Sequence, residues 1–433
     1  MRLRPAYLAM HKGRNKTARL TDRKEFFMIG AKTSGGVLSG IRVLDFGRYI
    51  AGPYCAALLA DMGADVIRIE KREGSEDRFV QPIIPEAEPG AGGEGAMFLQ
   101  MNRNKRGLTL DPMTETGRGI VKRLVATADI VVANLPPSTL KAMGLDYESL
   151  SAVKPDIILT TVSAFGHGGP YSERTGFDGV AQSMVGAAYL TGGPDEPVKS
   201  YAPWVDFGTA SLTAFGTMAA LMERAKTGKG QIVEGGLLST ALAYFNFHLV
   251  EQQLRQTNRQ AIGNRSPYAG PADIVRTKDG WILVQAIGAP LFKRWARLMG
   301  EDHWLTDPRF KDDLARGDNG ELLSARTSEW AATRTTEEAL AELEKARIPA
   351  GAVNTPQQAL DDPHIAAMGY LQPMEFPGLP GPAPIMETPV RLSQTPGTLH
   401  MRAPLLGEHT QSILTDLGYS EAEIEAFQAE GII

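Results

Sequence analysis

The sequence predicts an α/β protein that combines a Rossmann-like large domain, built on a parallel sheet, with a smaller α+β domain. Short β-branched runs alternate with helical segments between residues 41 and 163, which is the pattern of βαβ units. A length of 433 residues exceeds one ordinary domain. The predicted organisation is a basic N-terminal extension (1–35), the large domain (36–230), a connecting helix (231–260), the small domain (261–350), a Pro/Gly-rich linker (351–400) and C-terminal helices that return to the large domain (401–433).

The large domain is expected to contain five buried strands before its long helix. Their predicted ranges are 41–46, 64–70, 106–111, 129–134 and 156–163. Helices are expected at 51–63, closed by a glycine, at 114–128, and at 207–225, which is followed by the stop signal KTGKG. The first strand–helix turn reads GRYIAGP and lacks the GxGxxG pattern, so a standard dinucleotide site is disfavoured.

The second half predicts a smaller domain, a stiff connection and a helical end. A strand-like QIVEGG leads to a helix at 236–257, a hairpin is expected at 273–285 around its KDG turn, and helices at 289–299 and 323–346. Proline restricts the backbone, so 351–400 should be an extended, stiff linker. Residues 1–35 are basic with sparse, irregular apolar residues, and we expect a disordered arm or an over-long predicted start. A targeting peptide is disfavoured, because the segment lacks the apolar core of a secretion signal and is poor in serine.

Composition excludes several classes of function. A content of 43% hydrophobic and 22% charged residues is typical of soluble globular proteins. The net charge of −5 disfavours a nucleic-acid surface, and no apolar run is long enough to span a membrane. The single cysteine, Cys55, excludes an internal disulfide and agrees with a cytoplasmic location; we expect it to be a small buried helix residue. The seven histidines are scattered without ligand spacing, so no metal site is predicted.

The glycine-rich stretch 175–216 holds three carboxylates, Asp178, Asp195 and Asp206. Asp206 stands at the entry to the helix predicted at 207–225, where free backbone N–H groups favour an anion. A cap without further function is the alternative for Asp206, since aspartate is a preferred N-cap residue. Asp195 lies in GGPDEP, which is a turn by composition, so Asp206 is the preferred functional carboxylate.

Basic residues near predicted strand ends suggest an anionic ligand. Ligands of parallel sheets bind beyond the carboxyl ends of the strands, where Lys71 and Arg72 follow a strand directly. The segment MNRNKRG adds Arg103, Lys105 and Arg106. Together these side chains would supply local positive charge for a phosphorylated ligand, although solvated charge pairs are the alternative.

Seven motifs in order resemble those of the class III CoA-transferases, a superfamily that includes formyl-CoA, carnitine-CoA and succinyl-CoA-dependent transferases and α-methylacyl-CoA racemase. They are VLDFGRYIAGPYCAALLADMGADVIRIEK, NRNKRGLTLD, ADIVVANLPP, RTGFDGVAQSMVG, KTGKGQ, APLLGEHT and LGYS, and the Asp206 segment lies among them. The resemblance covers roughly residues 37 to 430. It implies an interlocked homodimer of ring-shaped subunits, which the stiff linker would suit, and acyl-CoA and a carboxylic acid as substrates without a metal.

The resemblance also implies roles for individual residues. Asp206 matches the catalytic aspartate, which would attack a thioester and pass CoA through an anhydride and an aspartyl-CoA thioester. The implied CoA-binding residues are Tyr49, Ile50, Ala51, Lys71, Leu110, Asn134, Leu135, Thr175, Gly176, Phe177 and Asp178. Five bulky residues near this site suggest a partly apolar acceptor pocket: Tyr49, Phe165, Phe177, Tyr201 and Trp204.

Departures from the family pattern narrow the expected function. Ala142 stands where a basic residue is often found, and the polyglycine lid of formyl-CoA transferases is missing from 259–280, which argues against formyl-CoA and oxalate as substrates. A racemase would need a second acid–base group at position 177, where Phe177 cannot carry a proton. CoA transfer is therefore favoured over racemisation, and a non-catalytic CoA-binding homologue is a third alternative against which the intact Asp206 argues.

Overall fold

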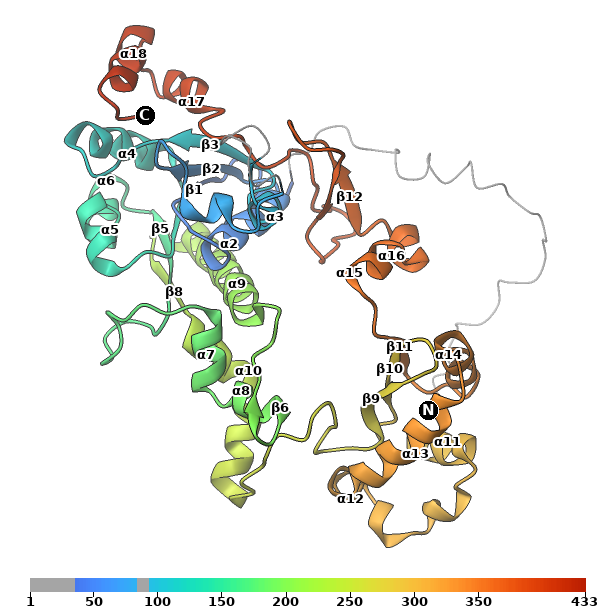
Figure 1. Cartoon of the computed structure of the whole chain (residues 1–433). Helices are drawn as coiled ribbons and strands as arrows, with labels where there is room; N and C mark the ends of the chain where they lie inside the picture. Colours follow the sequence, from blue (N-terminus) through green and yellow to red (C-terminus); the bar gives the residue numbers. More distant parts are fainter. Residues whose placement is uncertain (1–35, 84–92) are drawn as a thin grey trace, which may run out of the picture. The chain divides into compact units, whose positions relative to one another are not determined.

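The computed structural model describes residues 36–83 and 93–433 and contains a six-stranded parallel sheet (Figure 1). The N-terminal extension 1–35 lies outside the described residues. The strands are β1 Arg42–Asp45, β2 Asp65–Glu70, β3 Lys105–Thr109, β4 Ile130–Ala133, β5 Ile158–Ser163 and β8 Ile232–Gly236. They run in the order β3-β2-β1-β4-β5-β8, and every neighbouring pair is parallel. The predicted α/β class is confirmed, and the strand order changes direction between β1 and β4, the place where such sheets bind ligands.

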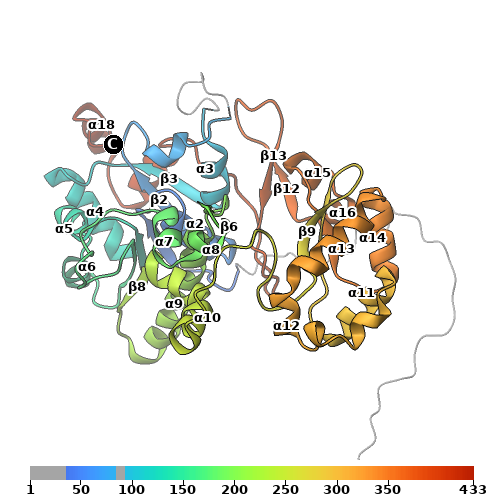
Figure 2. The ribbon, with the colours of Figure 1, turned by 60° about the horizontal axis from the view of Figure 1, so that its bottom comes forward.

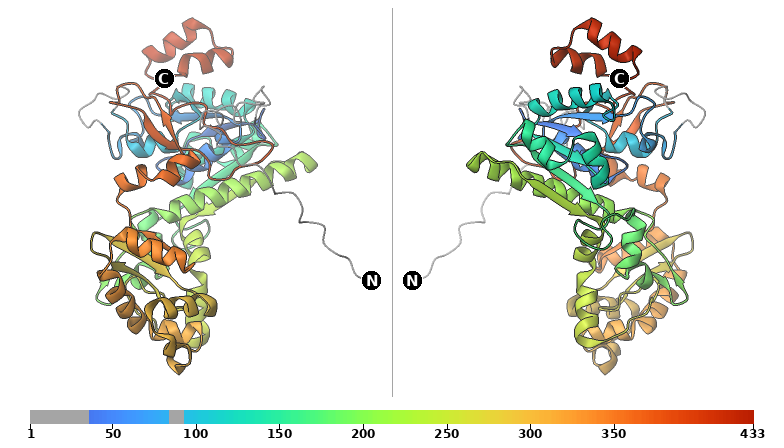
Figure 3. Two further views of the ribbon diagram at one scale, coloured as in Figure 1. Left: turned by 90° about the vertical axis from the view of Figure 1, so that its right-hand side faces the viewer. Right: turned by 90° about the vertical axis from the view of Figure 1, so that its left-hand side faces the viewer.

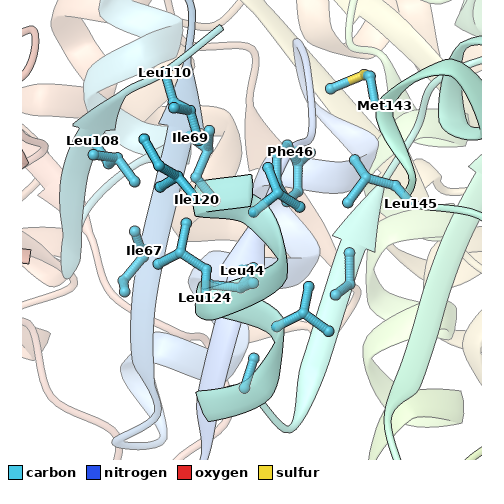
Figure 4. Close-up of a cluster of buried hydrophobic side chains, with 14 of the residues drawn as sticks. Leu44, Phe46, Ile67, Ile69, Leu108, Leu110, Ile120, Leu124, Met143 and Leu145 are labelled. Atoms are coloured by element: carbon cyan, nitrogen blue, oxygen red, sulfur yellow. The ribbon is translucent and has the colours of Figure 1, made fainter. Parts of the chain in front are cut away.

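Helices cover both faces of this sheet because alternate residues of each strand point to opposite faces. On one face Val43, Val66 and Ile130 pack with α2 Ala51–Asp61 and α9 Trp204–Thr227. On the other face the next residues along the same strands pack with α4 Glu115–Thr127, and Leu44, Ile67 and Leu124 lie together there (Figure 4). Runs that are apolar at every position are expected for strands buried on both faces.

The C-terminal helices α17 Thr410–Asp416 and α18 Glu421–Ala429 return to this sheet, beside β3. The backbone N–H of Asp111 donates to the Ile432 carbonyl oxygen at 2.8 Å, and the N–H of Thr109 donates to Thr410 Oγ1 at 3.0 Å. The last residues of the chain therefore complete the core that covers α4.

A second sheet is antiparallel and follows the order β11-β10-β9, with β9 Ala272–Arg276, β10 Trp281–Gln285 and β11 Ala350–Ala352 (Figure 2). Its helices are α11 Ala289–Met299, α12 Asp313–Asp318, α13 Gly320–Ala332 and α14 Thr336–Lys345. The single helix predicted at 323–346 is wrong, because Thr335 and Glu338 form a capping box that starts a new helix.

The segment 351–400 is not a continuous extended linker. It contains α15 Pro356–Leu360, α16 Pro363–Met368 and a hairpin of β12 Leu371–Met374 and β13 Ala383–Met386. Thr355 forms a capping box with Gln358, and Asp362 caps α16. Proline at the first position of both helices is compatible with a helix start, so proline content alone overestimated how extended the segment is.

The remaining elements are α3 Ala96–Met101, α5 Pro137–Met143, α6 Tyr147–Val153, α7 Asp178–Met184, α8 Ala187–Leu190, β6 Gly192–Gly193, β7 Glu196–Pro197, α10 Leu237–Arg255 and the 3-10 helices η1 Glu76–Phe79, η2 Asp302–Leu305 and η3 Pro308–Phe310. They are short except for α10, and α7 and α10 contact α9. Helices α9 and α10 (green to yellow-green in Figure 3) contact each other near their starts, where Thr209 Oγ1 donates to Thr240 Oγ1 at 2.9 Å. No helix within the described ranges is long and apolar enough to cross a membrane.

Candidate active site

Asp206 lies inside the first turn of α9 and not at its cap. The helix begins three residues earlier than predicted, at Trp204, and its N-cap is Pro203, whose side chain makes no capping hydrogen bond. The simple reading of Asp206 as an N-cap is therefore wrong. Gly208 follows in the same turn, where a Cβ would lie 2.5 Å from the Tyr244 ring of α10, so a glycine is required for the two helices to approach this closely.

The capping group of α9 is the carboxylate of Asp178, at the start of α7. Asp178 Oδ2 accepts hydrogen bonds from the backbone N–H groups of Val205 at 2.7 Å and Asp206 at 3.1 Å. Asp178 Oδ1 accepts from Gln182 Nε2, and Gln182 Oε1 accepts from the N–H of Ser200 at 2.9 Å. A buried carboxylate from one helix thus fixes the backbone that carries Asp206 and the loop that precedes it.

The environment of Asp206 favours its protonated form. Burial and the nearby charge of Asp178 raise the pKa of Asp206 to about 7. Both causes act against a negative charge, because a carboxylate loses hydration on burial and is repelled by a second carboxylate. A carboxyl group with a pKa near neutrality in a cavity is typical of functional sites.

Asp206 lines a cavity of about 250 Å³ together with most of the residues that the sequence predicted. These lining residues are Tyr49, Ile50, Ala51, Asn134, Leu135, Thr175, Gly176 and Phe177. The rings of Tyr49 and Phe177 meet edge to face, with their centroids 5.6 Å apart. The cavity thus unites the ends of β1 and β4 with the starts of α7 and α9. Asp178 is not among its lining residues, and it acts on Asp206 through its charge and through the hydrogen bond to the Asp206 backbone.

A second cavity, of about 430 Å³, holds the other two predicted residues, Lys71 and Leu110. Arg48 and Leu135 line both cavities, so the two adjoin at the ends of β1 and β4. Arg72 also lines the second cavity, and Lys71 Nζ lies 2.7 Å from Glu76 Oε1. The two adjoining cavities therefore contain Lys71 and Arg72 as well as Asp206.

The basic side chains of the MNRNKRG segment do not serve a ligand. Arg103 and Lys105 are fully buried, 2.7 Å from Asp61 Oδ2 and 2.8 Å from Asp45 Oδ2, respectively. Arg106 Nη2 lies 2.8 Å from Asp65 Oδ2. The expectation that these residues supply free positive charge is wrong, since each one neutralises a carboxylate of the sheet or of α2.

Three of the five bulky residues expected in an acceptor pocket do not line the cavity that holds Asp206. The Phe165 ring packs against Tyr171, the Trp204 ring stacks on Tyr244, and Tyr201 is 93% exposed. The cavity instead gains Arg48 and Arg174, and sequence reasoning did not place Arg174 there. Arg48 follows the first strand directly, and that position was the available signal for it.

Two other candidates are excluded as reactive groups. Asp195 is exposed in the turn between β6 and β7, as its composition predicted. Cys55 is buried in α2, and burial raises the pKa of its thiol to about 12, so it is not a nucleophile. The described residues contain no cluster of His, Cys, Asp and Glu that could hold a metal ion.

Comparison with known proteins places this site in a family. The model of CoA-transferase family III matches residues 38–410. The chain is 35% identical to the succinyl-CoA–D-citramalate CoA-transferase of Chloroflexus aurantiacus, over 92% of this chain and 98% of that protein. It is 32% identical to the succinate–glutarate CoA-transferase of Agrobacterium fabrum, over 88% and 95% of the two chains.

A solved structure agrees with these relatives in fold. A CAIB/BAIF family protein from Brucella suis superposes with a TM-score of 0.77 at 34% identity, over 88% of this chain and all of that one. The resemblance expected from the motifs is confirmed, and the matched range includes Asp206, the whole of the first cavity and every lining residue of the second except Gly431. The chain is an enzyme that belongs to CoA-transferase family III.

Proposed function

We propose that this enzyme moves CoA from succinyl-CoA to a dicarboxylic acid through covalent intermediates on Asp206. The observation that carries the proposal is the position of Asp206, held at the start of α9 inside the cavity that Tyr49 and Phe177 also line. Glu173 lines the same cavity, but it is exposed on a loop. Asp206 is partly buried and its backbone is fixed, as a nucleophile requires.

The chemistry follows from a carboxylate beside a thioester. Asp206 attacks the acyl carbonyl carbon with one oxygen, the carbon–sulfur bond breaks, and an acyl–aspartyl anhydride and CoA thiolate result. Asp206 Cγ then accepts the thiolate, and the donor acid leaves with an oxygen that came from Asp206. The same two steps in reverse load the acceptor acid. One activated carbonyl is exchanged for another, so the reaction needs no nucleotide triphosphate.

The second cavity has a role in retaining CoA during these steps. Lys71 and Arg72 would hold the phosphorylated end of CoA. The rest of CoA would extend past Arg48 and Leu135, which line both cavities, to Asp206. Binding at a remote group keeps the free thiolate near the Asp206 carbonyl. Backbone N–H groups at the glycine-rich turns around Phe177 would stabilise the oxyanions.

The choice of substrates rests on the relatives and on charge. The relatives are named for succinyl-CoA or succinate together with citramalate, glutarate or mesaconate, all of which are dicarboxylates. Arg174 lies over the Tyr171 ring at 3.9 Å and lines the Asp206 cavity, where a cation would attract a second carboxylate. A dicarboxylate therefore suits this site better than an uncharged acyl group.

An isotope-exchange assay tests the proposal. We expect labelled succinate to enter succinyl-CoA when no other acceptor acid is added, because the donor half-reaction is reversible on Asp206. A parallel incubation of a 2-methylacyl-CoA in deuterium oxide should give no deuterium at Cα, since Phe177 offers no second base. Deuterium incorporation without succinate exchange would favour the racemase reaction and contradict CoA transfer.

The rate of transfer should depend on the protonation of Asp206. The nucleophile must be ionised, so kcat/KM should fall as the pH decreases through about 7, the value to which burial and Asp178 raise the pKa of Asp206. In Asp178→Asn the acid limb should move to lower pH, because the repelling charge is removed while an oxygen remains to accept from Val205 and Asp206. The measurement is kcat/KM from about pH 5 to about pH 9 for both proteins. An acid limb that does not move in Asp178→Asn would contradict this electrostatic role.

We further propose the interlocked homodimer that the family resemblance implies. Large apolar side chains are exposed along α9 and α10: Phe215 at 73%, Met222 at 64%, Phe247 at 59% and Leu254 at 76%. Exposed apolar surface of this kind is typical of an interface. Sedimentation at nanomolar concentration should still detect a dimer, since interlocked subunits cannot separate without unfolding, and a folded monomer under these conditions would contradict the interlock.

A further inference from the structure

The turn that follows β1 contains a bulky residue in an unfavourable backbone conformation. Tyr49 has φ +61°, in the left-handed region that side chains other than glycine rarely adopt. Its ring is nevertheless part of the Asp206 cavity and meets the Phe177 ring edge to face. Such a conformation persists only when its surroundings hold it in place.

The group that holds this turn is the side-chain amide of Asn134, at the end of β4. Asn134 Oδ1 accepts from the backbone N–H of Arg48 at 2.6 Å, and Asn134 Nδ2 donates to the carbonyl oxygen of the same residue at 2.8 Å. Both main-chain groups of the residue before Tyr49 are thus fixed by one side chain. The amide contacts the first turn of α2 closely, since a Cβ on Gly52 would lie 3.0 Å from Asn134 Oδ1.

The other side of the turn is tied to buried charges. The carbonyl oxygen of Gly47 accepts from Arg68 Nη1 at 2.6 Å, and the N–H of Gly47 donates to Asp45 Oδ1 at 2.8 Å. Gly47 and Arg48 are therefore both immobilised, and Tyr49 is the next residue along the chain. The backbone of Tyr49 has little freedom to relax while these hydrogen bonds last.

We infer that Asn134 is a positioning residue that shapes the thioester-binding end of the cavity through Tyr49. Its amide is engaged with the backbone of Arg48, and the Tyr49 ring is the part of this arrangement that supports Phe177. The inference rests on the proposed function, because it assumes that an acyl-CoA occupies this cavity. It assigns to Asn134 an indirect role that acts on binding even where its side chain makes no contact with the ligand.

A double-mutant cycle tests this inference, in an Asp206→Asn background that does not consume the ligand. Binding of succinyl-CoA would be measured by calorimetry for the parent protein, for Asn134→Ala, for Tyr49→Ala and for the double variant. We expect Asn134→Ala to weaken binding at least about tenfold and to have almost no further effect once Tyr49→Ala is present, because coupled residues are not additive. Asn134→Asp, which keeps an acceptor for Arg48 but loses the donor, should show the same coupling if Asn134→Ala does not fold.

Asn319→Ala is the matched control. The Asn319 amide is likewise bonded to the backbone, donating to the carbonyl oxygens of Arg309 at 3.2 Å and Ala315 at 2.9 Å, but Asn319 lines neither cavity. Its affinity for succinyl-CoA should equal that of the parent. If the fold-losses in affinity of Asn134→Ala and Tyr49→Ala multiply in the double variant, or if Asn134→Ala binds as tightly as the parent, the inference about Asn134 is overturned but the proposed function is not. A parent protein that does not bind succinyl-CoA would contradict the proposed function as well.

Discussion

Replacement of Asp206 by Asn should lower kcat for CoA transfer at least about 10³-fold while acyl-CoA still binds, because the amide cannot attack the thioester. Asp206→Glu is the sharper companion variant. It keeps the carboxylate but moves it by one methylene group, and a displacement of about 1 Å is enough to cost roughly 100-fold in rate. Activities of the purified variants would be compared with their affinities for succinyl-CoA, and near-normal transfer by a folded Asp206→Asn protein would contradict the assignment.

The same variant should not lose stability. The pKa of Asp206 is raised to about 7 in the folded protein. The ionised carboxylate therefore opposes folding at every pH above the pKa that this group has in the unfolded chain. An amide removes this penalty, and the free energy of unfolding at a pH above 7 should increase or stay the same. If Asp206→Asn loses activity but gains stability, Asp206 serves the reaction and not the stability of the fold.

Lys105→Met should lower the free energy of unfolding by about 3–5 kcal/mol, because it leaves a buried carboxylate without its partner. Lys105 Nζ donates to Asp45 Oδ2 at 2.8 Å, to the Pro53 carbonyl oxygen at 2.8 Å and to Asn102 Oδ1 at 2.9 Å. Asp45 is 0% exposed and would keep the N–H of Gly47 at 2.8 Å, but the cation left beside it would be Arg68, whose Nη1 lies 3.9 Å away. Denaturant unfolding followed by circular dichroism would measure the loss.

A surface ion pair provides the control for Lys105. The Lys226 side chain is 72% exposed and lies 3.7 Å from Glu223, so Lys226→Met should change stability by less than about 0.5 kcal/mol. Equal losses in Lys105→Met and Lys226→Met would show that the buried pair has no special importance.

The part of the site that sequence could predict is the part that follows from the sheet. Tyr49 and Asn134, which the family resemblance implies as binding residues, follow β1 and β4, and they lie in one cavity because the carboxyl ends of parallel strands meet at one edge. The alternation of strands and helices was equally sufficient for the α/β class. These predictions depend on local patterns and on a general rule of sheet architecture.

Long-range pairings could not be predicted in the same way. Asp178 caps the helix that carries Asp206 from 28 residues away, and no local pattern links the two. Lys105 and Arg103 look like surface charges in the sequence, and only the tertiary structure brings them to Asp45 and Asp61. The helix break before α14 is different, because Thr335 and Glu338 have the spacing of a capping box, a local sequence pattern that by itself predicts a helix start.

The most direct test of the central claim is the transfer of oxygen from the acid to Asp206. The enzyme would be incubated with succinyl-CoA and with succinate whose carboxylate oxygens carry the heavy isotope. After digestion, mass spectrometry would measure the mass of the peptide that contains Asp206. Labelled succinate attacks Asp206 Cγ of the aspartyl-CoA thioester, and the thiolate then cleaves the anhydride at the succinyl carbonyl carbon, so the bridging oxygen of the acid stays on Asp206. Over repeated turnovers the peptide should therefore gain the mass of one and then two heavy oxygen atoms. A peptide that stays unlabelled while CoA is exchanged between the acids would contradict a covalent role for Asp206.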